Sequence, residues 1–215
     1  MRVWFARLET DPALIREFDA NLDPHERERA SRFVFERHKI RYVFAHGVLR
    51  DVLSRATGLP PGILAFTLND FGKPYLQNSL QFNLSHSEDL VAIGLVDRRE
   101  IGVDVEFVRP MSNLEDIAAS VYTPGELASL LQAQGDARER LFFRFWTRKE
   151  SYVKAIGKGL SIPLNTFDTR FPHVENWWIQ DLTSVPAGYS GAVTVERGMP
   201  ESGMEDIEYC EWLPR

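Results

Sequence analysis

Hydrophobic residues recur along this chain at two different spacings, which predict two kinds of element. Between residues 30 and 55 they recur every three or four positions, the spacing of a helix with one buried face. A second long helix is expected over 138–156, where Gly157 and Gly159 close it. Short apolar or alternating runs predict strands at 1–8, 80–84, 90–96, 101–106, 167–170, 177–182 and 191–196. The chain is therefore expected to mix helices with short strands.

Helix starts are marked by capping residues. Aspartate followed by proline at 11–12 and 23–24 is typical of a helix start, and the second pair is expected to open the long helix. Residues 112–115 and 123–126 both have the spacing of a capping box, with a glutamate three positions after a serine or threonine. Two short helices are therefore expected before the second long one.

The three predicted strands between residues 80 and 106 are separated by short polar connections, which favours an antiparallel meander. In a meander the first and third strands run in the same direction. Ser85 and His86 would then lie at the same edge of the sheet as Asp104 and Glu106. This shared edge predicts one site.

The two halves of the chain have a similar order of elements: a long helix, a glycine stop, a proline turn and then strands. We therefore expect an α+β fold of two similar lobes, each a small, mostly antiparallel sheet packed with a long helix. The expected lobes are residues 1–107 and 108–215. The acidic segment 201–211 is expected to be loosely ordered.

Charge restricts the classes of partner. The net charge of −6 and pI near 5.4 argue against a nucleic-acid-binding protein, which needs a broad basic face. Basic residues nevertheless crowd one segment, where they could steer a small polyanion or an acidic protein: Arg27, Arg29, Arg32, Arg37, Lys39, Arg41 and Arg50. A solvated helix face is the alternative for most of them.

Cysteine content and hydropathy bear on the compartment. The single cysteine, Cys210, cannot form an internal disulfide and fits a reducing compartment. No apolar run approaches the ~20 residues of a membrane span. We expect a cytoplasmic protein with no membrane partner.

Two acidic motifs carry the candidate chemistry. Asp104 and Glu106 are two apart, so on a strand both carboxylates leave the same face. Glu150 and Lys154 are four apart, so on a helix they share one face. Carboxylates and phosphate oxygens are the ligands that Mg²⁺ takes, and a lysine supplies a point charge for phosphate. The motifs together predict phosphoryl transfer, whereas each alone could be a solvated strand edge or a surface ion pair.

These motifs also carry a family resemblance. The segment 102–106, followed by 145–154, resembles the two-part signature of 4'-phosphopantetheinyl transferases of the surfactin type. Phe71-Gly72-Lys73-Pro74, which also predicts a turn, the segment 82–87 and Arg41 match the family as well. The resemblance extends from about residue 26 to residue 167 in the same order.

The resemblance implies a reaction. An enzyme of this family transfers the phosphopantetheine arm of coenzyme A to a serine of an apo acyl- or peptidyl-carrier protein and releases 3',5'-ADP. Asp104, Glu106 and Glu150 match the family's ligands for Mg²⁺, for which Mn²⁺ is an alternative. Lys154 matches a lysine beside the pyrophosphate. Further positions, taken together with Asp104 and Lys154, match contacts to coenzyme A: Arg41, Lys73, Ser85 and His86.

Several questions stay open at this point. Glu150 or a metal-held water could take the carrier serine's proton, and Glu126 is a rival base, although its capping-box spacing already accounts for it. A Mg²⁺-dependent nuclease or phosphodiesterase, or a non-catalytic module that binds coenzyme A or a carrier, are the alternative functions. The resemblance leaves open whether the carrier serves fatty-acid, polyketide or peptide synthesis. We expect a monomer.

Overall fold

The structure is a computed structural model that describes residues 1–198 and 206–214. Its helices within these ranges are α1 (Pro12–Asn21), α2 (Pro24–Ser31), α3 (Glu36–Thr57), α4 (Leu114–Val121), α5 (Pro124–Gln132) and α6 (Asp136–Ile156). Its strands are β1 (Arg2–Arg7), β2 (Thr67–Leu68), β3 (Pro74–Tyr75), β4 (Leu80–Ser87), β5 (Leu90–Asp97), β6 (Ile101–Phe107), β7 (His173–Val174), β8 (Trp177–Asp181), β9 (Tyr189–Glu196) and β10 (Glu208–Glu211). The predicted α+β class is confirmed. No helix in the described ranges has both the length and the apolarity of a membrane span.

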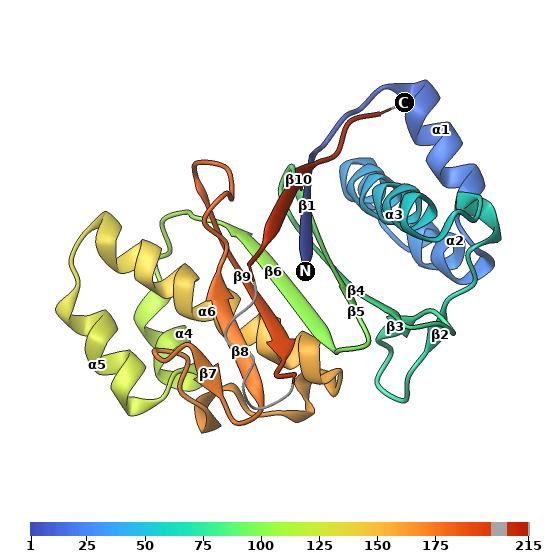
Figure 1. Ribbon diagram of the computed structural model, residues 1–215. Coiled ribbons are helices and arrows are strands. Elements are labelled where there is room, and N and C mark those ends of the chain that lie inside the picture. Colours follow the sequence, from blue (N-terminus) through green and yellow to red (C-terminus); the bar gives the residue numbers. More distant parts are fainter. Residues whose placement is uncertain (199–205, 215) are drawn as a thin grey trace.

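Two four-stranded sheets form the centre of the molecule, in the orders β10-β1-β5-β4 and β6-β9-β8-β7 (Figure 1). Helix α3 packs on the outer face of the first sheet, where Phe44 and Val48 meet Ile93 in one buried cluster. Helix α6 covers the second sheet. Between the sheets, Val3 of β1 and Val103 of β6 belong to a second buried cluster. Both sheets therefore bury their two faces.

The predicted meander is correct for its first two strands and wrong for the third. β4 pairs antiparallel with β5, but β6 leaves that sheet and pairs with β9. β6 still lies beside β4, because side chains of β4 accept hydrogen bonds from its backbone N–H groups. The three pairs are Asn83 with Val103 (2.8 Å), Ser85 with Val105 (3.3 Å) and Ser87 with Phe107 (3.1 Å). The expected shared edge is thus built by side chains.

The helix predicted over 30–55 is two helices. α2 ends at Ser31, and Phe35 is extended before α3 begins. Arg50 of α3 bonds to Asp23 at 3.0 Å and to Glu26 at 2.8 Å, so the start of α2 is tied across α3. These bonds fix the start of α2 beside the middle of α3, so the two helices cannot form one continuous helix.

Three smaller expectations also differ. Asn113, and not Ser112, is the residue before α4, and no side chain caps that helix. Residues 167–170 form no strand, and the short strand β7 was not predicted. The other capping box, at Thr123, is confirmed.

The C-terminal segment is more ordered than expected over the residues that the structure describes. β10 pairs in parallel with β1. Trp212 follows it, is only 3% exposed and donates from Nε1 to Asp51 at 2.7 Å. Residues 201–205 of the predicted loose segment lie outside the described residues. Strands from before and after residue 107 therefore pair with each other, β1 with β10 and β6 with β9. The division into two lobes at residue 107 stays a prediction.

Candidate active site

The predicted residues Ser85, Asp104 and Lys154 meet where β4, β6 and α6 come together. Asp104 Oδ1 accepts from Lys154 Nζ at 2.6 Å and from Ser85 Oγ at 3.0 Å. Lys154 Nζ also donates to Ser85 Oγ at 3.0 Å. Asp104 is only 3% exposed, so its carboxylate is shielded from water, whereas the Lys154 side chain is 29% exposed.

A glycine allows this meeting. A Cβ on Gly102 would lie 2.0 Å from the carbonyl oxygen of Ser151 and 2.3 Å from the nitrogen of Ala155. No side chain larger than hydrogen fits there, so β6 and α6 touch backbone to backbone. Asp104 lies two positions further along β6, on the same face, and reaches the last turn of α6.

The other two predicted carboxylates lie around Asp104. Ser87 Oγ donates to Glu106 Oε2 at 2.7 Å. Glu150 has neither a hydrogen-bond nor an ion-pair partner among the described residues. Burial and then the charge of Asp104 raise the pKa of both Glu106 and Glu150. Burial likewise raises the pKa of Asp104, against the effects of Lys154 and Ser85. The cluster holds more negative charge than its single lysine offsets.

The donor set fits a cation. Asp104 Oδ2 is buried and has no hydrogen-bond partner in the part of the chain that the structure describes, a costly state that a metal ion would relieve. Over the same residues, no group of three His, Cys, Asp or Glu side chains is arranged so that it could hold a metal ion as it stands. Oxygen ligands of this kind suit Mg²⁺ or Mn²⁺.

Basic side chains lie around His86, the residue that follows Ser85 in β4. Loss of hydration, followed by the basic side chains of His46, Lys154, Arg41 and Arg29, lowers the pKa of His86 to about 4. Because the His86 side chain is exposed to solvent, the positive charge of these neighbours contributes more to the lowered pKa than loss of hydration does. Four cationic or potentially cationic side chains therefore surround His86.

Arg41 and His46 are both held by carboxylates. Arg41 Nη2 donates to Glu88 at 2.7 Å and to Asp89 at 3.1 Å. His46 Nδ1 lies 2.9 Å from Glu26 Oε1. Arg29 was predicted only as part of a basic segment, and His46 was not predicted to belong to the site. Arg29 lies on α2, and His46 is five positions from Arg41 on α3, which is not the spacing of one helical face, so no local signal linked these residues.

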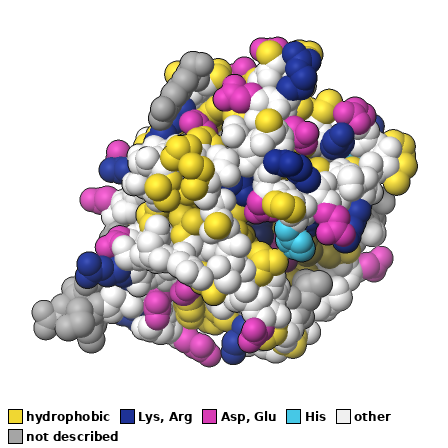
Figure 2. All heavy atoms as spheres, turned by 90° about the vertical axis from the view of Figure 1, so that its right-hand side faces the viewer, with side chains coloured by type: hydrophobic (Ala, Val, Ile, Leu, Met, Phe, Trp, Pro, Cys, Tyr) yellow, Lys and Arg dark blue, Asp and Glu magenta, His cyan; other side chains and the backbone are white. Residues whose placement is uncertain are grey.

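The basic segment does not form a broad basic face. Arg50 is fully buried among acids, and Arg32 pairs with Glu28. Figure 2 shows the side of the molecule where α1–α3 lie: basic and acidic side chains are interspersed there, around a hydrophobic area. Of the residues in this basic segment, Arg29 and Arg41 are the ones whose charge acts on His86.

The structure does not bring Lys73 to this cluster. Its Nζ donates to Glu100 at 2.6 Å, to the Ala155 carbonyl at 2.9 Å and to the Ile101 carbonyl at 3.1 Å. All three donors of the ammonium group are therefore engaged. The predicted contact to coenzyme A has no support in this arrangement.

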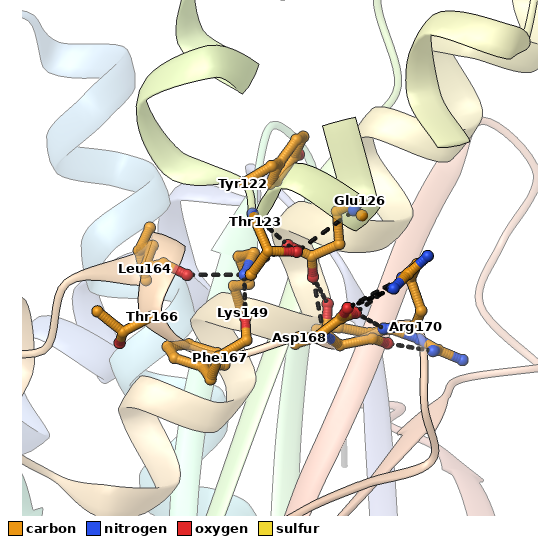
Figure 3. A network of polar contacts seen from close by, with 12 residues as sticks. Tyr122, Thr123, Glu126, Lys149, Leu164, Thr166, Phe167, Asp168 and Arg170 are labelled. Atoms are coloured by element: carbon orange, nitrogen blue, oxygen red, sulfur yellow. Dashed lines mark hydrogen bonds and ion pairs between the residues drawn. The ribbon is translucent and has the colours of Figure 1, made fainter. Parts of the chain in front are cut away.

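Glu126 lies apart from the cluster as well, inside the C-terminal half (Figure 3). It is fully buried, completes the capping box with Thr123 and pairs with the buried ammonium of Lys149 at 2.8 Å. Its other oxygen accepts from the nitrogen (2.8 Å) and hydroxyl (2.6 Å) of Thr169. Every contact of Glu126 is structural.

Comparison with known families gives two matches that cover most of the chain. Residues 13–95 match the family described as 4'-phosphopantetheinyl transferase, N-terminal. Residues 100–192 match the 4'-phosphopantetheinyl transferase superfamily. The second match contains the strand and helix that carry Asp104, Glu106, Glu150 and Lys154.

Individual relatives agree. The chain is 35% identical to the 4'-phosphopantetheinyl transferase HetI of Nostoc sp. over 166 residues, which are 75% of this chain and 70% of that protein. It is 33% identical to the 4'-phosphopantetheinyl transferase Sfp of Bacillus subtilis over 155 residues, 71% of this chain and 68% of that protein. Identity at this level over two thirds of both proteins, added to the family matches, leads to one conclusion: the chain is an enzyme of the 4'-phosphopantetheinyl transferase superfamily.

Proposed function

We propose that this enzyme transfers the phosphopantetheine arm of coenzyme A to a serine of an apo acyl- or peptidyl-carrier protein, with release of 3',5'-ADP. The observation that carries the proposal is the contact of buried Asp104 with Lys154 and Ser85, in which one Asp104 oxygen has no hydrogen-bond partner within the described ranges. The nucleophile belongs to the partner protein, so this chain has to bind and orient a polyanion. A cluster of carboxylates beside basic side chains suits that task.

The three carboxylates would hold the metal. Asp104, Glu106 and Glu150 are the residues we assign to a Mg²⁺ ion, and Mn²⁺ fits the same oxygen ligands. When bound, the ion would supply positive charge at the pyrophosphate of coenzyme A. Two observations support this assignment. Asp104 Oδ2 has no hydrogen-bond partner among the described residues, and the charge of Asp104 raises the pKa of both Glu106 and Glu150.

The basic side chains would hold the substrate's phosphates. Arg41 and His86 are assigned to the nucleotide phosphates of coenzyme A, and Ser85, which precedes His86 in β4, is assigned to coenzyme A as well. Lys154 would stabilise the charge on the leaving group. Its Nζ already lies 2.6 Å from a buried carboxylate oxygen, so its position is fixed before substrate arrives.

Glu150 is the side chain we assign to the carrier serine's proton. Burial and Asp104 raise its pKa, which makes its carboxylate a better base than an exposed glutamate. Both carboxylate oxygens of Glu126, the rival base, already accept from Thr123, Lys149 and Thr169. We propose that the reaction takes place in the cytoplasm and that the enzyme is a monomer.

Intact mass of apo carrier proteins, after incubation with the enzyme, coenzyme A and Mg²⁺, tests the function. The carrier should gain one phosphopantetheine mass, and excess chelator should abolish the gain. Asp104→Asn should lose the activity, whereas Lys158→Met, which removes an exposed lysine, should keep it. Failure to modify any of several fatty-acid, polyketide and peptide carriers, or equal modification in chelator, would contradict the proposal.

Steady-state kinetics separate binding from chemistry. Arg41→Ala should raise KM for coenzyme A more than it lowers kcat, because a phosphate contact is made in both the ground and transition states. Lys154→Ala should mainly lower kcat, because the leaving group gains charge as the bond breaks. The reverse partition would overturn these two assignments.

A further inference from the structure

The hairpin of β2 and β3 lies against the C-terminal end of α6. The residues in contact are 82 and 88 positions apart in the sequence. Asn69 Nδ2 donates to the Gly157 carbonyl at 2.9 Å. Lys73 Nζ donates to the Ala155 carbonyl at 2.9 Å. The last carbonyl groups of a helix have no partners within the helix. These two side chains therefore supply partners to the end of α6.

The hairpin is shaped for this contact. Asn69 Oδ1 accepts from the backbone nitrogens of Phe71 and Lys73, both at 2.9 Å, which fixes the turn. Gly157 has a φ of +71°, and a Cβ there would lie 2.9 Å from Lys73 Cδ. The turn and the helix end thus fit closely around a glycine. A positive charge is also favourable at a helix C-terminus.

Lys73 binds the strand as well as the helix. Besides Ala155, its ammonium donates to the Ile101 carbonyl at 3.1 Å, at the start of β6, and to Glu100 at 2.6 Å. The side chain is only 12% exposed. One ammonium group therefore joins the last turn of α6 to the beginning of β6.

This junction lies beside the catalytic pair. Ala155 follows Lys154 in α6, and Ile101 precedes Asp104 by three residues in β6. Between the two points, Gly102 puts the backbones of β6 and α6 in direct contact. A small slide of α6 along β6 would separate Lys154 Nζ from Asp104 Oδ1, now 2.6 Å apart.

We propose that Lys73 is a positioning residue that, together with Asn69, holds the last turn of α6 against β6 so that Lys154 and Asp104 meet. It acts through the helix and does not contact a phosphate of coenzyme A. The inference rests on the function proposed above. It assigns to the Phe-Gly-Lys-Pro turn a role in aligning the site, in place of the nucleotide contact expected from the sequence.

Kinetics with coenzyme A and with 3'-dephospho-coenzyme A distinguish the two roles. Lys73→Met should lower kcat by about ten- to a hundredfold, the scale of a misplaced reacting group, while KM for coenzyme A changes by less than about threefold. The preference for coenzyme A over its dephospho form should stay as in the wild type. Arg41→Ala, which we assign to a phosphate contact, should lose part of that preference, and the matched surface variant Lys158→Met should change neither parameter.

Asn69→Asp is the second variant. Neither the positioning role nor the phosphate-contact role of Lys73 assigns Asn69 to a phosphate of coenzyme A. It keeps the oxygen that fixes the turn but removes the N–H that donates to Gly157. We expect a kcat loss in the same direction as for Lys73→Met. Its activity also decides the question if Lys73→Met does not fold.

Amide hydrogen exchange gives a readout that needs no substrate. Amides of residues 150–157 should exchange faster in Lys73→Met and Asn69→Asp than in the wild type or Lys158→Met. This result stands even if no carrier is modified, so failure of the proposed function is separable from failure of this inference. A Lys73→Met protein with unchanged exchange in α6, unchanged kcat and a raised KM for coenzyme A would overturn it.

Discussion

Buried charges in this protein are surrounded by several oriented partners. Lys149 and Glu126 are both fully buried, and Lys149 also donates to the carbonyl oxygens of Leu164 and Phe167 at 2.7 Å each. Burial lowers the pKa of Lys149, and Glu126 opposes that effect. These contacts fix the segment after α6 to the helix that carries Glu150 and Lys154. Glu126 is therefore more than a helix cap.

Glu126→Gln tests that difference. As a cap alone the residue would contribute about 1 kcal/mol, but leaving a buried ammonium without its carboxylate costs about 3–5 kcal/mol. We expect a loss of the larger size in the free energy of unfolding, measured by chemical denaturation, with kcat per folded molecule within a few-fold of the wild type.

The control for Glu126→Gln is Glu115→Gln, which removes an exposed ion pair with Arg138 and should cost less than about 1 kcal/mol. A Glu126→Gln protein of normal stability but nearly without activity would instead identify Glu126 as the base.

Glu26 makes stability depend on pH. Burial alone would raise its pKa, but His46, the backbone N–H of Asp23 and Arg50 outweigh burial and lower the pKa below the ordinary 4.5. The unfolded chain then binds the proton more tightly than the folded protein does, so the contribution of this carboxylate is complete above pH 4.5 and is lost as the pH falls through the folded-state pKa.

The gap in unfolding free energy between wild type and Glu26→Gln should therefore shrink as the pH falls below 4.5. Denaturation curves at neutral and acid pH measure it. The exposed Glu28→Gln should show a small gap that varies little with pH. A gap for Glu26→Gln that is constant with pH would contradict this account.

At the scale of elements, the seam between β4 and β6 replaces a backbone ladder with side chains. Asn83 is only 8% exposed, and its Oδ1 accepts from the Val103 N–H at 2.8 Å. Two serines repeat the arrangement further along β4. The side chains that join the two sheets are thus continuous with those that hold Asp104 and Glu106.

Asn83→Ala should leave the buried Val103 N–H without an acceptor and lower the free energy of unfolding by about 1–3 kcal/mol. Asn83→Asp, which keeps the acceptor oxygen, should be less harmful. For comparison, Asn78→Ala removes an exposed amide whose oxygen accepts from the Leu80 N–H and should cost less than about 1 kcal/mol. Equal stability of Asn83→Ala and Asn78→Ala, by denaturation, would refute a structural role for this seam.

At the scale of the whole molecule, the C-terminal segment closes the N-terminal half. Trp212 packs among α1 and α3 against Phe18 and Phe44 at ring-centroid distances of 5.9 and 5.7 Å. β10 adds a fourth strand beside β1. A segment that follows the entire second half of the chain therefore completes the core of the first.

Trp212→Ala should lower the free energy of unfolding by about 3–5 kcal/mol, the cost of removing a large buried aromatic side chain. Trp212→Phe keeps most of the volume and loses the bond to Asp51, so the loss should be smaller. Thermal and chemical denaturation measure both, with the exposed Leu213→Ala as the near-neutral control. A near-neutral Trp212→Ala would mean that the C-terminal segment adds little to this core.

The sequence by itself determined the features that depend on neighbouring residues. Aspartates 11 and 23 and Thr123 cap helices as predicted, and Gly157 ends α6 in a left-handed conformation. Caps and glycine stops act within a few residues, so their signals are local. The acidic motifs likewise predicted phosphoryl-transfer chemistry, because spacing on a strand or helix fixes which side chains share a face. The family itself was indicated by the resemblance of these motifs to a known signature.

Only the tertiary structure decided which distant segments meet. A short strand carries no local signal for its partner, so the pairing of β6 with β9 and of β10 with β1 was not predictable from spacing. Lys73 was assigned to a phosphate contact by the family resemblance, and Glu126 had a local interpretation as a cap, which is confirmed. The structure adds a distant partner for each: Lys73 donates to the Ala155 carbonyl at 2.9 Å, 82 residues away, and Glu126 pairs with Lys149, 23 residues away. A long charged side chain is directed by whichever unpaired groups the fold places within its reach, and those groups exist only once the chain has folded.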